Sequence, residues 1–216
     1  MERPSASSER TGDELNSRGE RPLADRPLAD LLAHVAAQRP APGGGTSAAL
    51  TCALAAGLTE MAAAFTLASE RYADSHDAMQ RVRERAAVVR HETLALAERE
   101  LHSYEPVLEA MRLPPDASDR ERRVAEALSQ ATDPPLAIAR AAAEVAELGA
   151  EAADGGNLHL RGDAITGVLL AEAACRSAGR LVEANLAQLP QDPRTGEILE
   201  LVTRGDAARR RVLDGD

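Results

Sequence analysis

The sequence contains no tryptophan and no lysine, and only one phenylalanine and two tyrosines among its 216 residues. Alanine and leucine supply most of the apolar side chains, whereas the aromatic and β-branched residues that favour strands are few. This balance predicts an all-α protein, in which small side chains let helices pack at short interaxial distances. The absence of lysine excludes Schiff-base chemistry and a lysine general base.

Cysteine is also scarce, since only Cys52 and Cys175 are present. Both lie in apolar segments far apart in the sequence, so we expect buried free thiols in a reducing compartment, with a structural disulfide as the alternative. The five histidines show no i, i+4 pair and no cysteine at ligand spacing, so no metal site is predicted. These histidines are His34, His76, His91, His102 and His159.

The formal net charge is −10, which argues against a nucleic-acid partner and against an anionic membrane surface. The first 25 residues are polar and charged and do not resemble a signal peptide. The apolar stretch 48–68 carries Thr51, Thr59 and Glu60 and is rich in alanine rather than leucine, which favours a central soluble helix over a membrane span. We therefore expect a cytoplasmic protein.

The pattern along the chain predicts a disordered tail over residues 1–24 and one helical domain over 25–216, a single-domain bundle with long antiparallel helices. A helix over 46–69 has almost no polar face, so it should be buried on most sides, in the bundle centre or against another subunit. A very long helix over 74–111 should be kinked or interrupted at Pro106. Further helices are expected near 26–39, 119–131, 133–153, 162–189 and 195–213.

The stretch Pro40–Ala49 holds three consecutive glycines, Gly43, Gly44 and Gly45, followed by Thr46 at the start of the apolar helix. A glycine loop that leads into a helix presents free N–H groups and the positive end of the helix dipole, which suit an anion or a polar heterocycle. No Gly-Lys-Ser/Thr follows and no strand precedes it, so it is neither a nucleotide P-loop nor a Rossmann turn. Tight packing of the loop on the helix is the alternative interpretation.

Three more segments follow in a fixed order: Leu96-Ala97-Glu98-Arg99-Glu100, then residues 104–114 with Leu-Glu-Ala-Met-Arg-Leu-Pro, then Gly156-Asn157-Leu158-His159-Leu160-Arg161-Gly162-Asp163. Together with the Pro-x-Pro-Gly-Gly-Gly loop, they resemble the formimidoyltetrahydrofolate cyclodeaminase and methenyltetrahydrofolate cyclohydrolase family. The resemblance spans residues 28–201.

This resemblance implies an all-α fold, a homodimer, and a reduced folate as substrate, with no prosthetic group. In the cyclodeaminase reaction, N10 attacks a formimino carbon on N5 and ammonia departs; in the cyclohydrolase reaction, water adds to the methenyl bridge and one C–N bond opens. Both reactions pass through a tetrahedral carbon and need proton transfer, for which a positioned carboxyl group is suited.

The resemblance places the catalytic carboxylate of the family at Glu100, where the family has aspartate. Glutamate is one methylene longer, and an error of about 1 Å can cost on the order of a hundredfold in rate. A solvated glutamate on a charged helix is the alternative for Glu100. We expect His102, two positions later on the helix, to point elsewhere.

The last block supplies Asp163, a second catalytic candidate that could bond the pterin amidine or orient the substrate; the alternative is a dipole partner of the helix that it opens. Asn157 suits a heterocycle edge, or else a left-handed turn. Arg112 and Arg161 could hold the folate carboxylates, or else form surface ion pairs. This chain has Gly162 where the family has a serine before the aspartate. It has Pro115 where the family has a lysine after Leu-Pro, so the positive charge at that position is lost.

These observations predict a folate one-carbon enzyme with cyclodeaminase activity first and cyclohydrolase activity second, with little to separate them. The substrate-binding residues would be Gly43, Gly44, Gly45, Thr46, Asn157 and Arg112. Two rivals remain: a helical homologue that binds folate without turnover, and a purely structural bundle.

Overall fold

The computed structural model describes residues 21–214, and every regular element in that range is helical. Residues 1–20 of the expected tail lie outside the described residues, as do residues 215 and 216. The helices are α1 (Leu28–Val35), α2 (Gly44–Leu67), α3 (His76–Ser103), α4 (Glu105–Met111), α5 (Arg120–Gln130), α6 (Asp133–Gly155), α7 (Arg161–Asn185) and α8 (Arg194–Asp214). Short 3-10 helices cover Leu23–Asp25, Glu70–Ser75 and Leu158–Leu160. The all-α prediction is confirmed.

The interruption expected at Pro106 separates α3 from α4. Tyr104 lies between the two helices, and Pro106 occupies the first turn of α4, where its missing N–H is tolerated. The helix expected over 74–111 is therefore two helices preceded by a 3-10 turn.

The described chain is already folded before residue 25, where the expected tail would end. The side chain of Leu23 is buried, and its backbone N–H donates to Glu98 Oε2 on α3 at 2.7 Å. This bond ties the segment ahead of α1 to the bundle.

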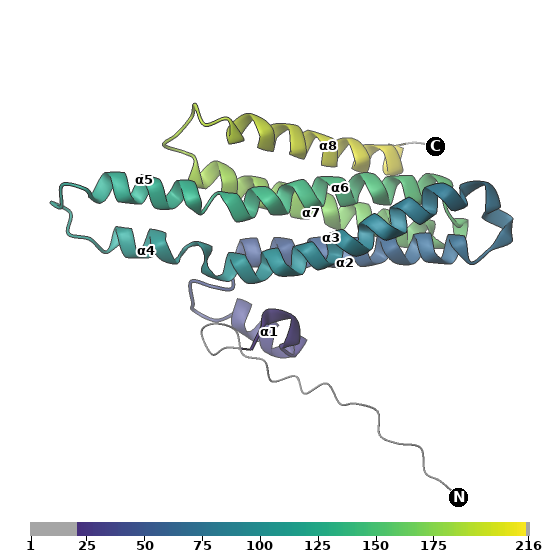
Figure 1. Ribbon diagram of the computed structural model, residues 1–216, viewed down its shortest axis with the longest axis horizontal. Helices are drawn as coiled ribbons and strands as arrows, with labels where there is room; N and C mark the ends of the chain where they lie inside the picture. The colour runs from purple at the N-terminus through teal and green to yellow at the C-terminus, as the bar shows by residue number, and fades with distance from the viewer. Residues whose placement is uncertain (1–20, 215–216) are drawn as a thin grey trace, which may run out of the picture.

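The long helices lie side by side in an elongated bundle (Figure 1). α2 packs against α3 and α7, α6 packs against α7, and α8 covers α6 and α7. The helices α4 and α5 pack on each other and extend beyond one end of the bundle (Figure 1). The short helix α1 lies beside the bundle and contributes the buried Leu31 to its main core. A small separate core holds α4 and α5 together and consists of Val107, Ala110, Ala127 and Ala131.

Small residues hold the central helices close together. The main core consists largely of fully buried alanines on α2, α6 and α7. At Gly149 on α6, a Cβ atom would come within 2.9 Å of Val168 and 3.2 Å of the Thr59 hydroxyl, so only glycine allows this approach of α6 to α7 and α2. Cys52 and Cys175 lie in this core as free thiols, as expected. Burial raises the pKa of Cys52 to about 12, so its thiol stays protonated and unreactive.

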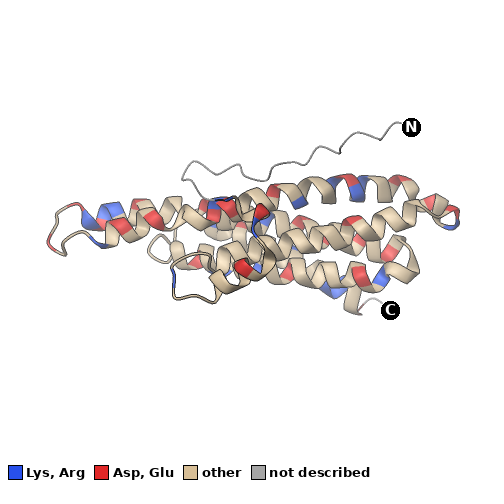
Figure 2. Ribbon diagram, turned by 90° about the horizontal axis from the view of Figure 1, so that it is seen from below, with Lys and Arg blue, Asp and Glu red and all other residues tan. Residues whose placement is uncertain are grey.

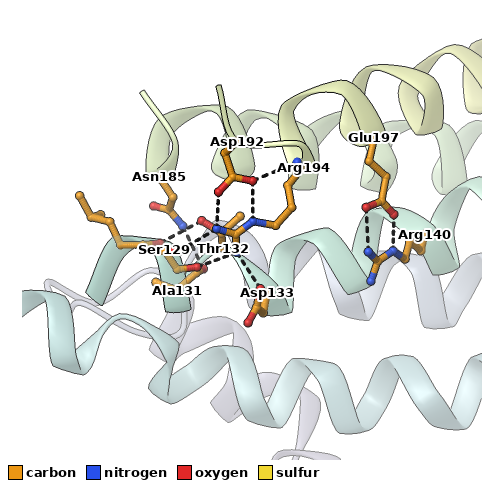
Figure 3. A network of polar contacts seen from close by, with 10 residues as sticks. Ser129, Ala131, Thr132, Asp133, Arg140, Asn185, Asp192, Arg194 and Glu197 are labelled. Carbon is orange, nitrogen blue, oxygen red and sulfur yellow. Dashed lines mark hydrogen bonds and ion pairs between the residues drawn. The ribbon is translucent and has the colours of Figure 1, made fainter. Parts of the chain in front are cut away.

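Ion pairs fasten α8 to α6 (Figure 3). The guanidinium of Arg194 donates to Asp192 and Asp133, and also to Ser129, while Arg140 forms a two-bond pair with Glu197. The bonds from Arg194 lower the pKa of Asp192 to about 2. These contacts lie at the α6–α8 side of the bundle and are structural.

One helix, α2, is long and apolar enough to cross a membrane by length and composition. Half of its most apolar stretch is buried inside the bundle, against α3, α6 and α7. Its remaining face carries an apolar stripe at helical spacing that is exposed or half-buried, made of Leu50, Leu54, Leu58, Met61 and Phe65. Figure 2 colours the ribbon by residue type and shows basic and acidic residues interspersed along the helices. The stripe is therefore a row of apolar side chains along one face of α2 that the described bundle leaves exposed or half-buried.

Candidate functional site

A cleft of about 780 Å³ opens where the N-terminus of α2 meets the C-terminus of α3. The segment 39–46 forms one side, the end of α3 and the start of α4 form the other, and the segment 26–34 borders the opening. The cleft brings together five residues that the sequence predicted for the site: Gly43, Gly44, Gly45, Thr46 and Glu100.

The floor of the cleft is the first turn of α2. Gly43 is the N-cap residue and no side chain in the described part of the chain caps the helix, so the backbone N–H groups of the first turn are presented to the cleft. At this end of α2, the N–H of Ser47 donates to the carbonyl of Gly43 at 3.0 Å. Because α2 is 24 residues long, this end also carries the positive end of a full helix dipole.

The hydroxyl of Thr46 is buried without a hydrogen-bond partner, alone in this respect among the described side chains. Threonines deeper in the helices, such as Thr59 and Thr66, donate to the carbonyl four residues earlier. Thr46 lies too near the helix start to have such a helical carbonyl. A buried hydroxyl without a partner costs about 1–3 kcal/mol, so a ligand that bonds it would recover this loss.

The carboxyl group of Glu100 reaches across the cleft to α2. A Cβ atom on Gly45 would lie 1.9 Å from Glu100 Oε1, so the carboxyl occupies the space that the missing side chain leaves. The hydroxyl of Ser103 donates to Glu100 Oε2 at 3.1 Å. Burial raises the pKa of Glu100 above its ordinary value of 4.5, and the Ser103 bond opposes this only in part. A carboxyl group whose pKa is raised by burial in a cleft is suited to give and take a proton.

Arginines border the opening of the cleft. Arg21, Arg26 and Arg39 all line it, from the segment before α1 and from the residue just ahead of Pro40. Guanidinium groups bind carboxylates with two parallel bonds. The sequence reasoning missed these three arginines; the position of Arg39 next to the glycine loop was the available signal.

His102 also lines this cleft, which corrects the expectation that it points away from the surface used by Glu100. The cleft wraps around the end of α3, so residues on two faces of its last turn reach it. His102 Nδ1 lies 2.9 Å from Oε1 of Glu105, the first residue of α4. The break between α3 and α4 could be predicted from Pro106, but the direction in which α4 continues from α3 could not.

Asn157 and Asp163 are absent from the cleft within one chain. The N–H of Asn157 donates to Thr66 Oγ1, near the C-terminus of α2, and Asp163 lies in the first turn of α7 close by. Gly45 and Thr66 are 21 residues apart on one helix, which corresponds to about 30 Å. The two blocks of sequence therefore lie at opposite ends of α2.

The backbone at Asn157 is not left-handed, since its φ is −65°, so the left-handed turn that was the alternative interpretation of this residue is wrong. Its side chain caps a 3-10 turn instead, accepting from the His159 N–H at 3.0 Å and from the Tyr72 hydroxyl at 3.2 Å. Arg112 ends α4, is exposed, and does not line the cleft. Arg161 begins α7, at the end of the bundle away from the cleft.

No group of three or more histidine, cysteine, aspartate or glutamate side chains within residues 21–214 is arranged to hold a metal ion. The chemistry that the cleft itself offers is that of a carboxyl group, a histidine–carboxylate pair and backbone donors.

The family model described as formiminotransferase-cyclodeaminase matches residues 27–202. A methenyltetrahydrofolate cyclohydrolase from Methylorubrum extorquens is 30% identical over 192 residues, which cover 85% of this chain and 92% of the relative. A formimidoyltransferase-cyclodeaminase from Sus scrofa is 32% identical over 148 residues, but the match covers only 27% of that longer protein. The crystal structure of formiminotetrahydrofolate cyclodeaminase from Thermotoga maritima superposes with a TM-score of 0.78 at 25% identity, covering 88% of this chain and 96% of that one.

Proposed function

Because the chain belongs to the formiminotransferase-cyclodeaminase family, we propose that it is an enzyme acting on the one-carbon unit between N5 and N10 of tetrahydrofolate. The observation that carries this proposal is the carboxyl group of Glu100, held against the uncapped N-terminus of α2 in a cleft of about 780 Å³. A relative that the chain matches over nearly its full length is named as a cyclohydrolase, and the structural relative is named as a cyclodeaminase. Both reactions are therefore to be assayed.

Glu100 is the proton-transfer group in this proposal. Burial raises its pKa and so favours the protonated carboxyl, which can protonate a departing nitrogen and take a proton back. The extra methylene relative to aspartate is accommodated because Gly45 has no side chain. Glutamate at this position therefore does not by itself argue for an inactive homologue.

The glycine loop and Thr46 bind the polar part of the substrate. Within residues 21–214, no side chain caps the first turn of α2, and the hydroxyl of Thr46 has no hydrogen-bond partner. They suit the lone pairs of a pterin or of an oxygen on the one-carbon unit.

Arg39 holds a carboxylate of the folate glutamate, in place of the Arg112 expected from the sequence. A bond between charged groups contributes about 1.5–3 kcal/mol. Arg39→Ser should therefore raise KM by about 10- to 150-fold and leave kcat unchanged. If Arg112→Ser raises KM in this way and Arg39→Ser does not, the assignment to Arg112 made from the sequence is the right one.

The working unit is a homodimer that pairs the apolar stripe of α2, Leu50 to Phe65, with the same stripe of a second copy. An antiparallel pairing would place the Thr66 end of one α2 beside the Gly45 end of the other. Asn157 and Asp163 of the partner would then approach Glu100, which accounts for the separation of about 30 Å within one chain. An enzyme of this kind, with free buried thiols, fits the expected cytoplasmic location.

The test is turnover by the purified protein of 5,10-methenyltetrahydrofolate and of 5-formimidoyltetrahydrofolate, the second followed by release of ammonia. Loss of either compound at a rate proportional to enzyme supports the proposal and identifies the leaving group. If neither compound reacts while tetrahydrofolate still raises the melting temperature, the chain is a folate-binding homologue without this activity.

A further inference from the structure

The chain contains one phenylalanine and two tyrosines, and among these three residues Tyr104 lines the cleft that holds Glu100. Tyr104 is 42% exposed, so a large part of this side chain is open to a ligand. Tyr72 lies instead at the far end of α2, where its hydroxyl donates to Asn157 Oδ1 at 3.2 Å. The bundle core is built largely of alanine, and the fold leaves the large ring of Tyr104 at the cleft.

Tyr104 continues the helix face that carries Glu100. It follows Glu100 by four residues, and its backbone keeps the right-handed helical conformation at the end of α3. The N–H of Leu108 donates to the carbonyl of Tyr104 at 3.1 Å, so the helical path extends from α3 into α4. Residues four apart lie on one face of a helix, and all three of these residues line the cleft. Four residues advance about 6 Å along a helix, so Tyr104 lies one turn beyond the carboxyl group on the same wall.

This part of the wall is apolar, and so is the chain on the other side of the cleft. Leu108 is half-buried beyond Tyr104. The opposite segment 39–46 contributes Pro40 and Ala41 to the lining, and proline has no N–H to donate. A flat ring without polar groups on its faces therefore suits the cleft next to Glu100 on the side of Tyr104.

The proposed substrate contains such a ring. Its p-aminobenzoyl ring is bonded directly to N10, one of the two nitrogens that hold the one-carbon unit. The pterin, on the N5 side, has the polar edge that the glycine loop and Thr46 bind in the proposed function. Aromatic side chains stack on planar rings in offset or edge-to-face arrangements. A ring held against Tyr104 therefore places N10 within one helical turn of the Glu100 carboxyl group.

We propose that Tyr104 binds the p-aminobenzoyl ring of the folate by stacking and so positions N10 beside Glu100; the inference rests on the proposed function. The hydroxyl group of Tyr104 has no part in this role. The residue is a binding residue, and the wall that it forms with Leu108 selects a substrate that carries an aromatic ring on N10.

The experiment measures the Kd of tetrahydrofolate by calorimetry, so that binding is tested independently of turnover. Tyr104→Ala should raise this Kd by about 5- to 100-fold, because the stacking and the apolar contact are both lost. Tyr104→Leu, which keeps an apolar side chain without a ring, should also raise it. Tyr104→Phe keeps the ring and should bind within about twofold of wild type. The matched control is Met111→Ala, which truncates a side chain of similar exposure, 43%, that does not line the cleft.

Two fragments of the substrate identify the ring that Tyr104 contacts. Tyr104→Ala should weaken the binding of p-aminobenzoyl-glutamate and leave the binding of 6-methyltetrahydropterin unchanged. Because Tyr104 is largely exposed, the melting temperature of the free variant should stay close to that of wild type. If Tyr104→Ala does not fold, Tyr104→Leu and Tyr104→Phe make the same comparison.

A wild-type Kd for tetrahydrofolate in the folded Tyr104→Ala or Tyr104→Leu variant would overturn the inference. So would a loss of affinity as large in Tyr104→Phe as in Tyr104→Ala, or weaker binding of 6-methyltetrahydropterin in Tyr104→Ala. Each of these results leaves the proposed function intact as long as the wild type turns over a folate. If the wild type neither binds tetrahydrofolate nor turns over a folate, the proposed function is wrong and this role of Tyr104 is wrong with it.

Discussion

The carboxyl group of Glu100 occupies the space where a side chain on Gly45 would be, with Oε1 1.9 Å from the position of the missing Cβ. An acidic group of α3 is therefore held directly against the dipole end of α2. This contact requires a residue without a side chain at position 45 and a long acidic side chain at position 100. Four predictions test what the contact and its surroundings do.

Gly45→Ala should displace the Glu100 carboxyl and lower kcat, by about a hundredfold if the shift is near 1 Å. Gly196→Ala on α8 is the matched control, because a Cβ at Gly196 meets nothing within 4 Å and Gly196 does not line the cleft. Steady-state kinetics of the two variants make the comparison. Equal kcat values in both variants would show that the position of the carboxyl does not matter.

Glu100→Gln should raise the stability of the free protein at pH 7. Burial raises the pKa of Glu100, so the folded state favours the protonated form. A carboxyl of this kind supports folding fully below its ordinary value of 4.5 and loses that contribution as pH rises through the raised pKa. Melting temperatures at pH 7 and pH 4 should show an advantage for Glu100→Gln that shrinks at pH 4; an advantage that grows as pH falls would contradict the raised pKa.

Thr46→Val should leave the free protein as stable as the wild type or more so, because the hydroxyl has no partner to lose. The same substitution at Thr59 breaks its bond to the Ala55 carbonyl and should lower the melting temperature by about 2–4 °C. Added tetrahydrofolate should stabilise Thr46→Val less than wild type, and Thr59→Val as much as wild type. A full tetrahydrofolate shift in Thr46→Val would exclude the hydroxyl from the binding site.

Mixing two inactive variants should restore activity if the site is shared between subunits. Glu100→Gln and Asp163→Asn each damage every site in their own homodimer, but a mixed dimer contains one site with both native residues. Co-expression should recover up to about half of the wild-type activity per mixed dimer. Activity would not recover if both residues of one site come from the same chain. Leu54→Glu, which places a charge in the apolar stripe of α2, should abolish both the dimer and the recovery of activity.

The helical class and the break near Pro106 could be predicted because they follow from local propensity and periodicity. The contact of Glu100 with the glycine loop was reachable only through the family resemblance, since residues 45 and 100 lie on two helices. The location of Asn157 and Asp163 could not be predicted, because it depends on the length of α2 and on how α7 packs. His102 was misjudged because the angle between residues on one helix does not reveal how far a cleft wraps around its end.

The most direct measurement is turnover of 5,10-methenyltetrahydrofolate and 5-formimidoyltetrahydrofolate by wild type and by Glu100→Gln, with tetrahydrofolate binding measured on the same samples. Wild type should turn over at least one compound, and Glu100→Gln should lose about 10²–10⁴-fold in kcat while binding tetrahydrofolate as before. Wild-type turnover that survives in Glu100→Gln would contradict the assignment of the proton-transfer step to this carboxyl group.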